Sequence, residues 1–172
     1  MTAMRAPSYA GLNCSIARAL AVLGDSWALL VLRDALGGVR SFEGFMRSLG
    51  IARNTLTDRL RHLVEEGMLT QVDVGKRGTR FEYVPTQKAK EFQVPLMAIM
   101  QWGDRWVSGP GNEPAVAFDR KSDLAIAPIT MRSSSGRAVS PDELMYKPGR
   151  GASKTTRDYL LAKNKRASAG ET

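Results

Sequence analysis

The sequence has very few of the side chains that hold metals or carry nucleophilic catalysis. It contains one cysteine, Cys14, and one histidine, His62, in 172 residues. A single cysteine excludes an internal disulfide framework, and a structural zinc site needs about four Cys or His ligands. His62 falls on the polar face of a predicted helix, and the chain has no Gly-x-Ser-x-Gly turn, P-loop or dinucleotide fingerprint. We therefore expect no enzyme, no cofactor and no bound metal.

Long apolar runs are absent as well. Because no run of about 18 apolar residues is present, the sequence predicts no membrane span. Residues 1–13 lack a charged region followed by an apolar stretch and a cleavage site, so we interpret them as a flexible N-terminal arm. The scarcity of cysteine favours a reducing, cytoplasmic location.

Positive charge is in excess. Lysine and arginine together number 25 against 17 acidic residues, which gives a formal net charge of +8. Such a balance favours a polyanionic partner, either nucleic acid or an anionic membrane surface, and does not choose between them. Hydrophobic residues make up 43% of the chain, which is enough for one core of ordinary size.

Apolar spacing and helix-ending glycines predict four helices in the N-terminal part of the chain. They cover residues 14–23, 27–36, 42–49 and about 52–66, and Gly24, Gly37, Gly50 and Gly67 follow them. Asp25 or Ser26 can cap the second helix, and Ser41 can cap the third. The second helix is apolar almost all round, so we expect it at the centre of the domain.

A basic hairpin and a long helix come next. Alternating residues predict strands at 68–74 and 79–84, joined by a turn at 75–78. Thr86 then caps a helix to about residue 107, which Pro95 should kink because proline removes a backbone hydrogen bond. This order predicts a winged helix-turn-helix, mainly α with a small β-hairpin wing (α+β), in one domain over residues 14–108.

The pattern changes beyond residue 108. We expect a small β-containing extension over residues 109–151, with short strands at 115–119 and 125–131 and a turn or one helical turn at 140–144. Residues 152–172 are polar, small and basic, and we expect them to form a disordered tail.

The fourth helix carries a candidate DNA-reading face. With Leu56 toward the core, its outward residues are of types that can bind base edges: Arg to guanine, Asn to adenine, Asp to cytosine, and Thr to several. The cations one turn further along and in the wing suit phosphates, as does the start of the third helix. The predicted DNA-binding residues are Ser41, Arg53, Asn54, Thr57, Asp58, Arg61, Lys76, Arg77 and Arg80.

A polar outer face is by itself typical of a solvated helix surface. Here a glycine-ended helix pair, a leucine-docked second helix and a basic hairpin follow one another directly, and together they favour a DNA-binding regulator. A protein-interaction module that uses the same fold, without a specific operator, is the alternative.

The sequence also contains an ordered set of motifs that resembles the HxlR family of bacterial winged-helix transcriptional regulators. The motifs are CSIARAL (14–20), LGDSW (23–27), LLVLR (29–33), FEGF (42–45), LTDRL (56–60), LVEEGML (63–69), EY (82–83) and WGDRW (102–106). The extension is similar to a tail that contains cysteine pairs in some members, and it has none here, which again predicts no metal.

The resemblance implies a homodimer built mainly from the first and last helices of the module, bound to a roughly palindromic operator of double-stranded DNA. The apolar stripe along the last helix agrees with this, because one small domain could hardly cover it. The residues expected at the dimer interface are Ile16, Leu20, Phe92, Leu96, Ile99, Trp102 and Trp106.

Two further hypotheses concern what such a protein would sense. Unpaired N–H groups at a helix start favour the thiolate of Cys14, and the resemblance implies that a cysteine at this place can sense oxidants or electrophiles. The alternative is a small buried residue that never reacts. A second set of residues could line a small-molecule effector pocket between subunits or form ordinary core: Trp27, Met46, Met97, Met100 and Trp102.

Overall fold

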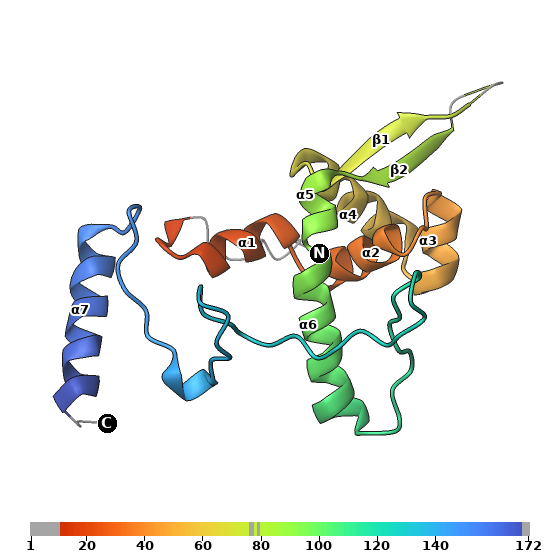
Figure 1. The fold of residues 1–172 in the computed structure, drawn as a ribbon. Helices are drawn as coiled ribbons and strands as arrows, with labels where there is room; N and C mark the ends of the chain where they lie inside the picture. The colour runs from red at the N-terminus through yellow and green to blue at the C-terminus, as the bar shows by residue number, and fades with distance from the viewer. Residues whose placement is uncertain (1–10, 76–77, 79, 170–172) are drawn as a thin grey trace.

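The computed structural model describes residues 11–75, 78 and 80–169, and this part is mainly helical with a two-stranded antiparallel hairpin, as predicted (Figure 1). The elements are α1 (Ser15–Leu23), α2 (Ser26–Leu36), α3 (Phe42–Leu49), α4 (Arg53–Glu65), β1 (Leu69–Asp73), β2 (Phe81–Pro85), α5 (Gln87–Glu91), α6 (Gln93–Gly103), the π-helical turn η2 (Asp104–Ser108), the short helix η3 (Pro141–Glu143) and α7 (Lys154–Ala169). Most of the predicted N-terminal arm lies outside the described residues.

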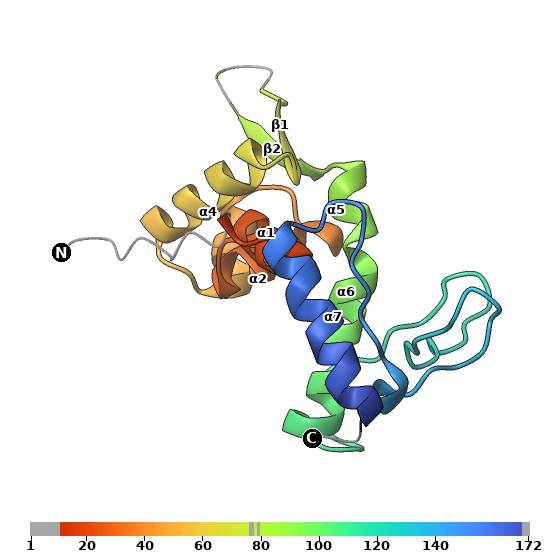
Figure 2. The same ribbon diagram turned by 90° about the vertical axis from the view of Figure 1, so that its left-hand side faces the viewer.

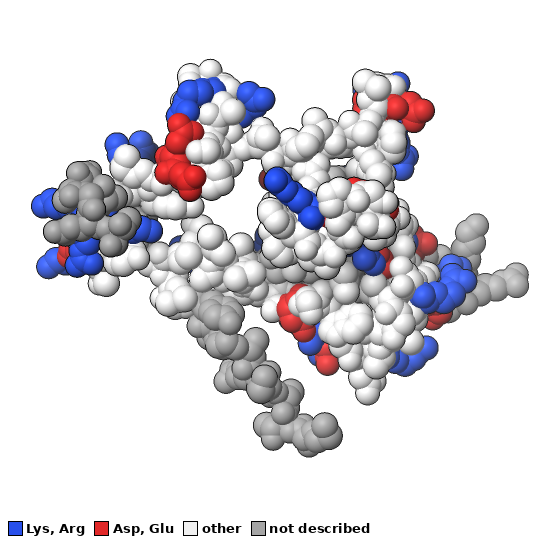
Figure 3. All heavy atoms as spheres, turned by 90° about the horizontal axis from the view of Figure 1, so that it is seen from below, with Lys and Arg blue, Asp and Glu red and all other residues white. Residues whose placement is uncertain are grey.

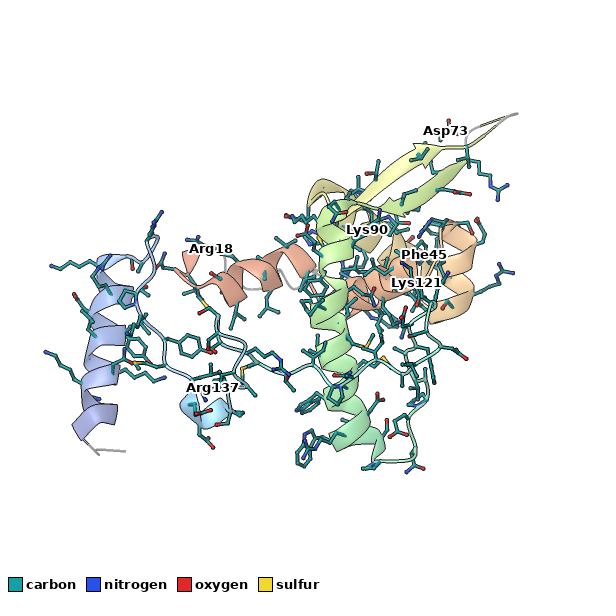
Figure 4. The ribbon with its side chains drawn as sticks, in the orientation of Figure 1. Arg18, Phe45, Asp73, Lys90, Lys121 and Arg137 are labelled. Carbon is teal, nitrogen blue, oxygen red and sulfur yellow. The ribbon has the colours of Figure 1, made fainter. Side chains whose placement is uncertain are left out.

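Helix α2 lies at the centre of the core, as its apolar sequence predicts. It packs against α3, α4 and β2, and α4 docks onto it through leucines spaced by four and then three residues. The largest fully buried side chains are Phe45, Leu32, Leu56, Leu60, Leu63, Leu69 and Val31, and Phe45 is labelled in Figure 4. Each such burial contributes about 1.5–3 kcal/mol relative to exposure.

The predicted caps hold the ends of these helices. The Asp25 carboxylate accepts a 3.0 Å hydrogen bond from the Ala28 amide, and the Ser41 hydroxyl accepts one of 3.1 Å from Gly44. Gly50 ends α3 with φ at +59°, a left-handed conformation that favours glycine. The left-handed backbone of Gly50 makes the tight turn between α3 and α4 possible.

The wing hairpin is tied to the helical body at its base. Leu69 pairs with Pro85 and Asp73 with Phe81, and the Tyr83 amide donates a 2.9 Å hydrogen bond to the Arg40 carbonyl. Figure 2 shows the hairpin projecting beyond the helices. The segment that leads into α3 therefore fixes the direction of the wing.

The long C-terminal helix of the domain is broken rather than kinked. The sequence predicts one helix with a bend at Pro95, whereas the structure ends α5 at Glu91 and begins α6 at Gln93. A proline ring clashes with the carbonyl four residues before it, which here is that of Glu91. Pro95 sits in the first turn of α6, where its missing N–H costs nothing.

The extension contains no regular strand among the described residues, so the two strands predicted there are wrong. Only isolated bridges form, between Phe118 and Ala125 and between Arg132 and Ala138. The segment is instead held by the side chain of Gln101, which donates to the Ala127 carbonyl at 3.2 Å and accepts from the Ile129 amide at 2.8 Å. The helical turn expected at 140–144 is confirmed as η3.

The basic tail was predicted to be disordered, and for α7 this is wrong. Ser153 begins the helix by accepting a 3.1 Å hydrogen bond from the Thr156 amide, and alanine, leucine, lysine and arginine then favour helix. Figure 1 shows α7 on the far side of α1 from the wing, and Figure 3 shows cationic side chains gathered over it. Asn13 anchors its start through the Gly151 carbonyl and the Ser153 amide.

No single helix in the described part of the chain is long and apolar enough to cross a membrane. Helices α1 and α2 reach the length and composition of a span only when taken together, and they are bent by 75° at their junction.

Candidate DNA-binding surface

The helix pair α3–α4 presents the N-terminal half of α4 to solvent. Gly50 turns the chain, Ile51 is buried against the core, and Ala52 precedes the first helical residue, Arg53. With Leu56, Leu60 and Leu63 facing α2, the polar residues of the first two turns must point outward. The predicted reading residues are all exposed: Arg53, Asn54, Thr57, Asp58 and Arg61.

Arg53 is held in place by an aromatic ring. Its guanidinium carbon lies 5.0 Å from the ring centroid of Phe42, the first residue of α3. A cation over an aromatic face gains about 0.5–1 kcal/mol at an exposed site. The contact holds the Arg53 side chain of α4 against the first residue of α3.

Thr57 is partly used within its own helix. Its hydroxyl donates a 2.9 Å hydrogen bond to the Arg53 carbonyl one turn earlier. The hydroxyl oxygen can still accept, and its methyl group is available to an apolar base edge such as that of thymine.

Asp58 and Arg61 form a pair on the exposed face. The Arg61 guanidinium nitrogen lies 3.4 Å from the Asp58 carboxylate, and both side chains are more than half exposed. Such a pair contributes little to stability because solvent screens it. It lowers the repulsion that Asp58 alone would exert on a phosphate backbone.

Ser41 joins the helix pair to the wing. Its hydroxyl caps α3, and its backbone forms an isolated bridge with Glu82 of β2. The hydroxyl hydrogen is not used in this cap, so Ser41 can still donate to a phosphate, as the sequence predicts.

The wing tip is stabilised from within. Figure 4 labels Asp73 at the outer end of β1, where its carboxylate accepts from the amides of Gly75 at 2.8 Å and Arg80 at 3.2 Å. This acid is therefore turned to its own backbone, and the Arg80 side chain remains exposed. Lys76 and Arg77, both predicted to bind DNA, lie outside the described residues.

The sequence reasoning missed three polar side chains that hold this surface in position. Arg59 on α4 lies 2.6 Å from Asp25, the residue that caps α2. His62, expected only on a polar surface, bonds the Val22 carbonyl through its Nε2 at 2.9 Å. Both partners are far away in the chain, so no local spacing could have revealed them. Arg40 bonds the carbonyls of Ala35 and Val39 just after α2, a common role for arginine near a helix end.

The base of the wing packs on the core through Tyr83. Its ring lies edge-on to that of Phe45, with centroids 6.4 Å apart. Burial raises the pKa of the Tyr83 phenol, because the charged phenolate is poorly solvated there. The orientation of the wing thus depends on the helix pair that it flanks.

Most of the residues expected at a dimer interface are exposed in the single chain. Ile16 is 70% exposed, Trp102 61% and Trp106 66%, and Leu20 and Ile99 are also exposed. Leu96 is half-buried, and Phe92 packs against the core of its own domain. Exposed apolar side chains of this size and number, on α1, α6 and η2, form a surface whose contact with water is unfavourable.

The residues expected to sense a signal are not brought together. Cys14 is exposed at the start of α1, which does not support the buried alternative. Met97 and Met100 line the cavities beside α6, and Trp102 lines one of them, whereas Trp27 and Met46 line neither. These two cavities of the single chain therefore do not bring the five residues together, and a pocket between subunits stays a hypothesis.

Comparison with known proteins agrees with this architecture. The family model for HxlR-like helix-turn-helix proteins matches residues 22–110. Rv3095 of Mycobacterium tuberculosis, named an uncharacterized HTH-type transcriptional regulator, is 34% identical over 137 residues, which are 80% of this chain and 87% of the relative. The similarly named sll1512 of Synechocystis is 32% identical over 95 residues, covering 55% of this chain and 70% of the relative.

Two solved structures match most of the chain. The candidate transcription factor PA1607 has a TM-score of 0.76 at 32% identity, covering 83% of this chain and 99% of that protein. PA1374 of Pseudomonas aeruginosa, another candidate transcription factor, has a TM-score of 0.62 at 38% identity, covering 85% and 99%. The matched family model spans more than half of the chain, and the fold is that of its solved relatives. The protein therefore belongs to the HxlR-like helix-turn-helix family.

Proposed function

We propose that this protein is a transcriptional regulator that binds a specific, roughly palindromic DNA operator as a homodimer. Family membership and fold support a DNA-binding regulator, and the residues of α4 support sequence-specific reading. The single observation that carries the specificity is the exposed first turn of α4, where Arg53 rests on Phe42. A side chain held in place loses less conformational freedom when it binds a base.

The reading face combines base-specific and backbone contacts. Arg53 and Asn54 are the residues suited to bidentate bonds with guanine and adenine, and each such pair discriminates by about 1–3 kcal/mol. Arg61, the wing arginine Arg80 and the hydroxyl of Ser41 suit phosphates, which fix register without reading sequence. The undescribed Lys76 and Arg77 belong to this set by their place in the sequence.

The homodimer is proposed from the apolar surfaces of α1, α6 and η2. The interface would use Ile16, Leu20, Ile99, Trp102 and Trp106, with Leu96 at its margin. A two-fold axis through this surface would place two copies of α4 on the same face of the DNA, about one helical turn apart.

The alternative is a winged-helix module that binds another protein and no specific operator. The Asp58–Arg61 pair and an otherwise solvated α4 face would be compatible with it. A protein interaction would depend little on salt, whereas binding to DNA weakens steeply as salt rises.

The deciding experiment is selection of bound fragments from genomic DNA with wild type, Arg53→Ala and Arg150→Ala. Arg150 is exposed in the turn before α7 and serves as the matched control. We expect a palindromic motif for wild type and Arg150→Ala, relaxed or lost in Arg53→Ala. If wild type enriches no motif, the protein-interaction alternative gains the support and the specific operator is ruled out.

A further inference from the structure

An apolar cavity lies between α2 and α6, roofed by residues 115–117 of the extension. Its volume is about 670 Å³, within the range of sites that hold small molecules. We propose that it binds an apolar small molecule that carries one hydrogen-bond acceptor, held by Arg33. Binding itself does not depend on the DNA-binding role; its regulatory meaning rests on that proposed function.

The walls of the cavity come from one face of each helix. On α2 the lining positions recur at three- and four-residue spacing, and on α6 they face them across the hollow. The lining includes Leu29, Leu30 and Arg33 of α2, Met97 and Met100 of α6, and Ala117 of the extension. Two methionines give the wall side chains that can adapt to the shape of a ligand.

The hollow differs from the surface assigned above to dimerisation. Leu29, Leu30, Met97 and Met100 are half-buried, as expected for a concave wall shielded by the chain itself. The residues most exposed on α1 and at the end of α6 do not line it, and only Leu96 and Ile99 are common to both sets. A second copy bound to the dimer surface would therefore cover the cavity only at Leu96 and Ile99 and leave its interior accessible to a small ligand.

Arg33 is the only charged side chain among the described residues that line the cavity. Its Nε and Nη2 donate to the same carboxylate oxygen of Asp34, at 2.9 and 2.7 Å. Asp34 is 8% exposed, and its other oxygen, Oδ2, is buried with no partner in the described structure. This pair fixes the guanidinium and leaves its remaining N–H groups able to meet an acceptor.

These features define the chemistry of the ligand. Among the described lining residues Arg33 is the one cation, and apart from Ser26 and Gln93 the others are apolar. Such a wall suits a molecule with a hydrophobic body and a single carbonyl, carboxylate or sulfonate group that faces Arg33. The Arg33 side chain is 54% exposed, so solvent reaches its free N–H groups, and a ligand acceptor that replaces this water forms a charge-assisted hydrogen bond. A ligand lacking that group forgoes this bond and should bind more weakly. The acceptor group therefore supplies specificity and the apolar body supplies most of the affinity.

The position of the cavity gives binding a regulatory consequence. Helix α2 carries the core on which α4 docks, while α6 carries the proposed dimer surface. A ligand bound between α2 and α6 would change the angle between the helix pair α3–α4 and the dimer axis. The distance between the two copies of α4 in the dimer would change with it. Only a ligand that binds the two arrangements differently would shift operator affinity.

The test uses two fluorescent probes that differ in one group. 8-Anilino-1-naphthalenesulfonate has an apolar body and an acceptor, and N-phenyl-1-naphthylamine is the same molecule without the sulfonate. We expect both to bind the full-length protein at one site per chain. Arg33→Gln, which keeps an amide donor for Asp34, should weaken the sulfonate probe about tenfold and leave the neutral probe within about twofold.

A second variant tests the cavity itself. Ala117→Trp fills it from the roof and should weaken both probes at least tenfold, whereas Ala138→Trp, exposed elsewhere in the extension, should change neither. Circular dichroism of each variant verifies that it is folded. The site is overturned if Arg33→Gln weakens both probes equally, or if Ala117→Trp binds them as wild type does. Probe binding that disappears as the protein dimerises would also overturn it, because a second copy would then occupy the hollow. None of these outcomes involves DNA, so they are independent of the operator selection.

Discussion

The guanidinium of Arg53 rests on the ring of Phe42, 5.0 Å from its centroid, so the first residue of α4 is positioned by the first residue of α3. A tight turn at Gly50 places the start of α4 close after the end of α3, and the long Arg53 side chain reaches from there to the first residue of α3. The side chain best suited to read guanine is therefore oriented before it meets DNA.

Phe42→Leu should weaken binding to the selected operator without moving the protein to a different one. Loss of the ring removes a contact of about 0.5–1 kcal/mol, which corresponds to roughly a two- to fivefold loss of affinity. Fluorescence anisotropy with labelled operator measures the change, and Phe118→Leu, exposed in the extension, serves as the control. A larger loss in Phe118→Leu than in Phe42→Leu would contradict the positioning role.

Asp58→Asn should strengthen binding to all DNA and reduce the preference for the operator. The substitution removes a negative charge from the exposed face and frees Arg61, now 3.4 Å from the Asp58 carboxylate, to bind a phosphate. One added phosphate contact steepens the dependence of log affinity on log salt by about 0.9. Titrations of operator and scrambled DNA at several salt concentrations measure both effects. An unchanged salt slope would show that pairing with Asp58 does not keep Arg61 from the backbone.

The sequence predicted the helix-turn-helix unit well because its signals are local. Asp25 and Ser41 cap the helices that they precede, and the spacing of Leu56, Leu60 and Leu63 alone orients α4 on the core. The outward face follows from that orientation. A residue whose role depends on neighbours three or four positions away is visible in the sequence.

The extension was predicted poorly because its support comes from elsewhere in the chain. Alternating apolar residues favour strands at 115–119 and 125–131, but a strand also needs a partner edge. Here the backbone of Ala127 and Ile129 bonds instead to the side-chain amide of Gln101 on α6. The polar, basic composition of residues 152–172 favours disorder, but the Ser153 cap and the helix-forming residues that follow it form α7.

Gln101→Leu should release the extension while leaving the core folded. The variant loses both hydrogen bonds to the extension, about 0.5–1.5 kcal/mol each, and so favours local opening. We expect faster amide hydrogen exchange at Ile129 and faster proteolysis between residues 118 and 135. Gln87→Leu, whose amide bonds only the side chain of Glu91, is the matched control. If exchange at Ile129 is the same in both variants, Gln101 is not the anchor.

Tyr83→Phe should change how stability depends on pH above about 10. Burial raises the pKa of Tyr83 above its usual value of 10.0, so the folded protein holds this proton more tightly than the unfolded chain does. The stability from the neutral phenol is complete below about pH 10 and is lost as the pH rises through the folded-state pKa, because unfolding then releases a proton.

Phenylalanine keeps the ring that packs edge-on against Phe45 but has no proton to release. The free energy of unfolding of wild type should therefore fall more steeply above about pH 10 than that of Tyr83→Phe. Urea unfolding at a series of pH values measures both curves. Tyr159→Phe removes a phenol that is 63% exposed on α7 and should follow the wild-type curve. Coincident slopes for wild type and Tyr83→Phe would mean that the wing base is as well solvated when folded as when unfolded, and the packing of the wing on the helix pair would need another cause.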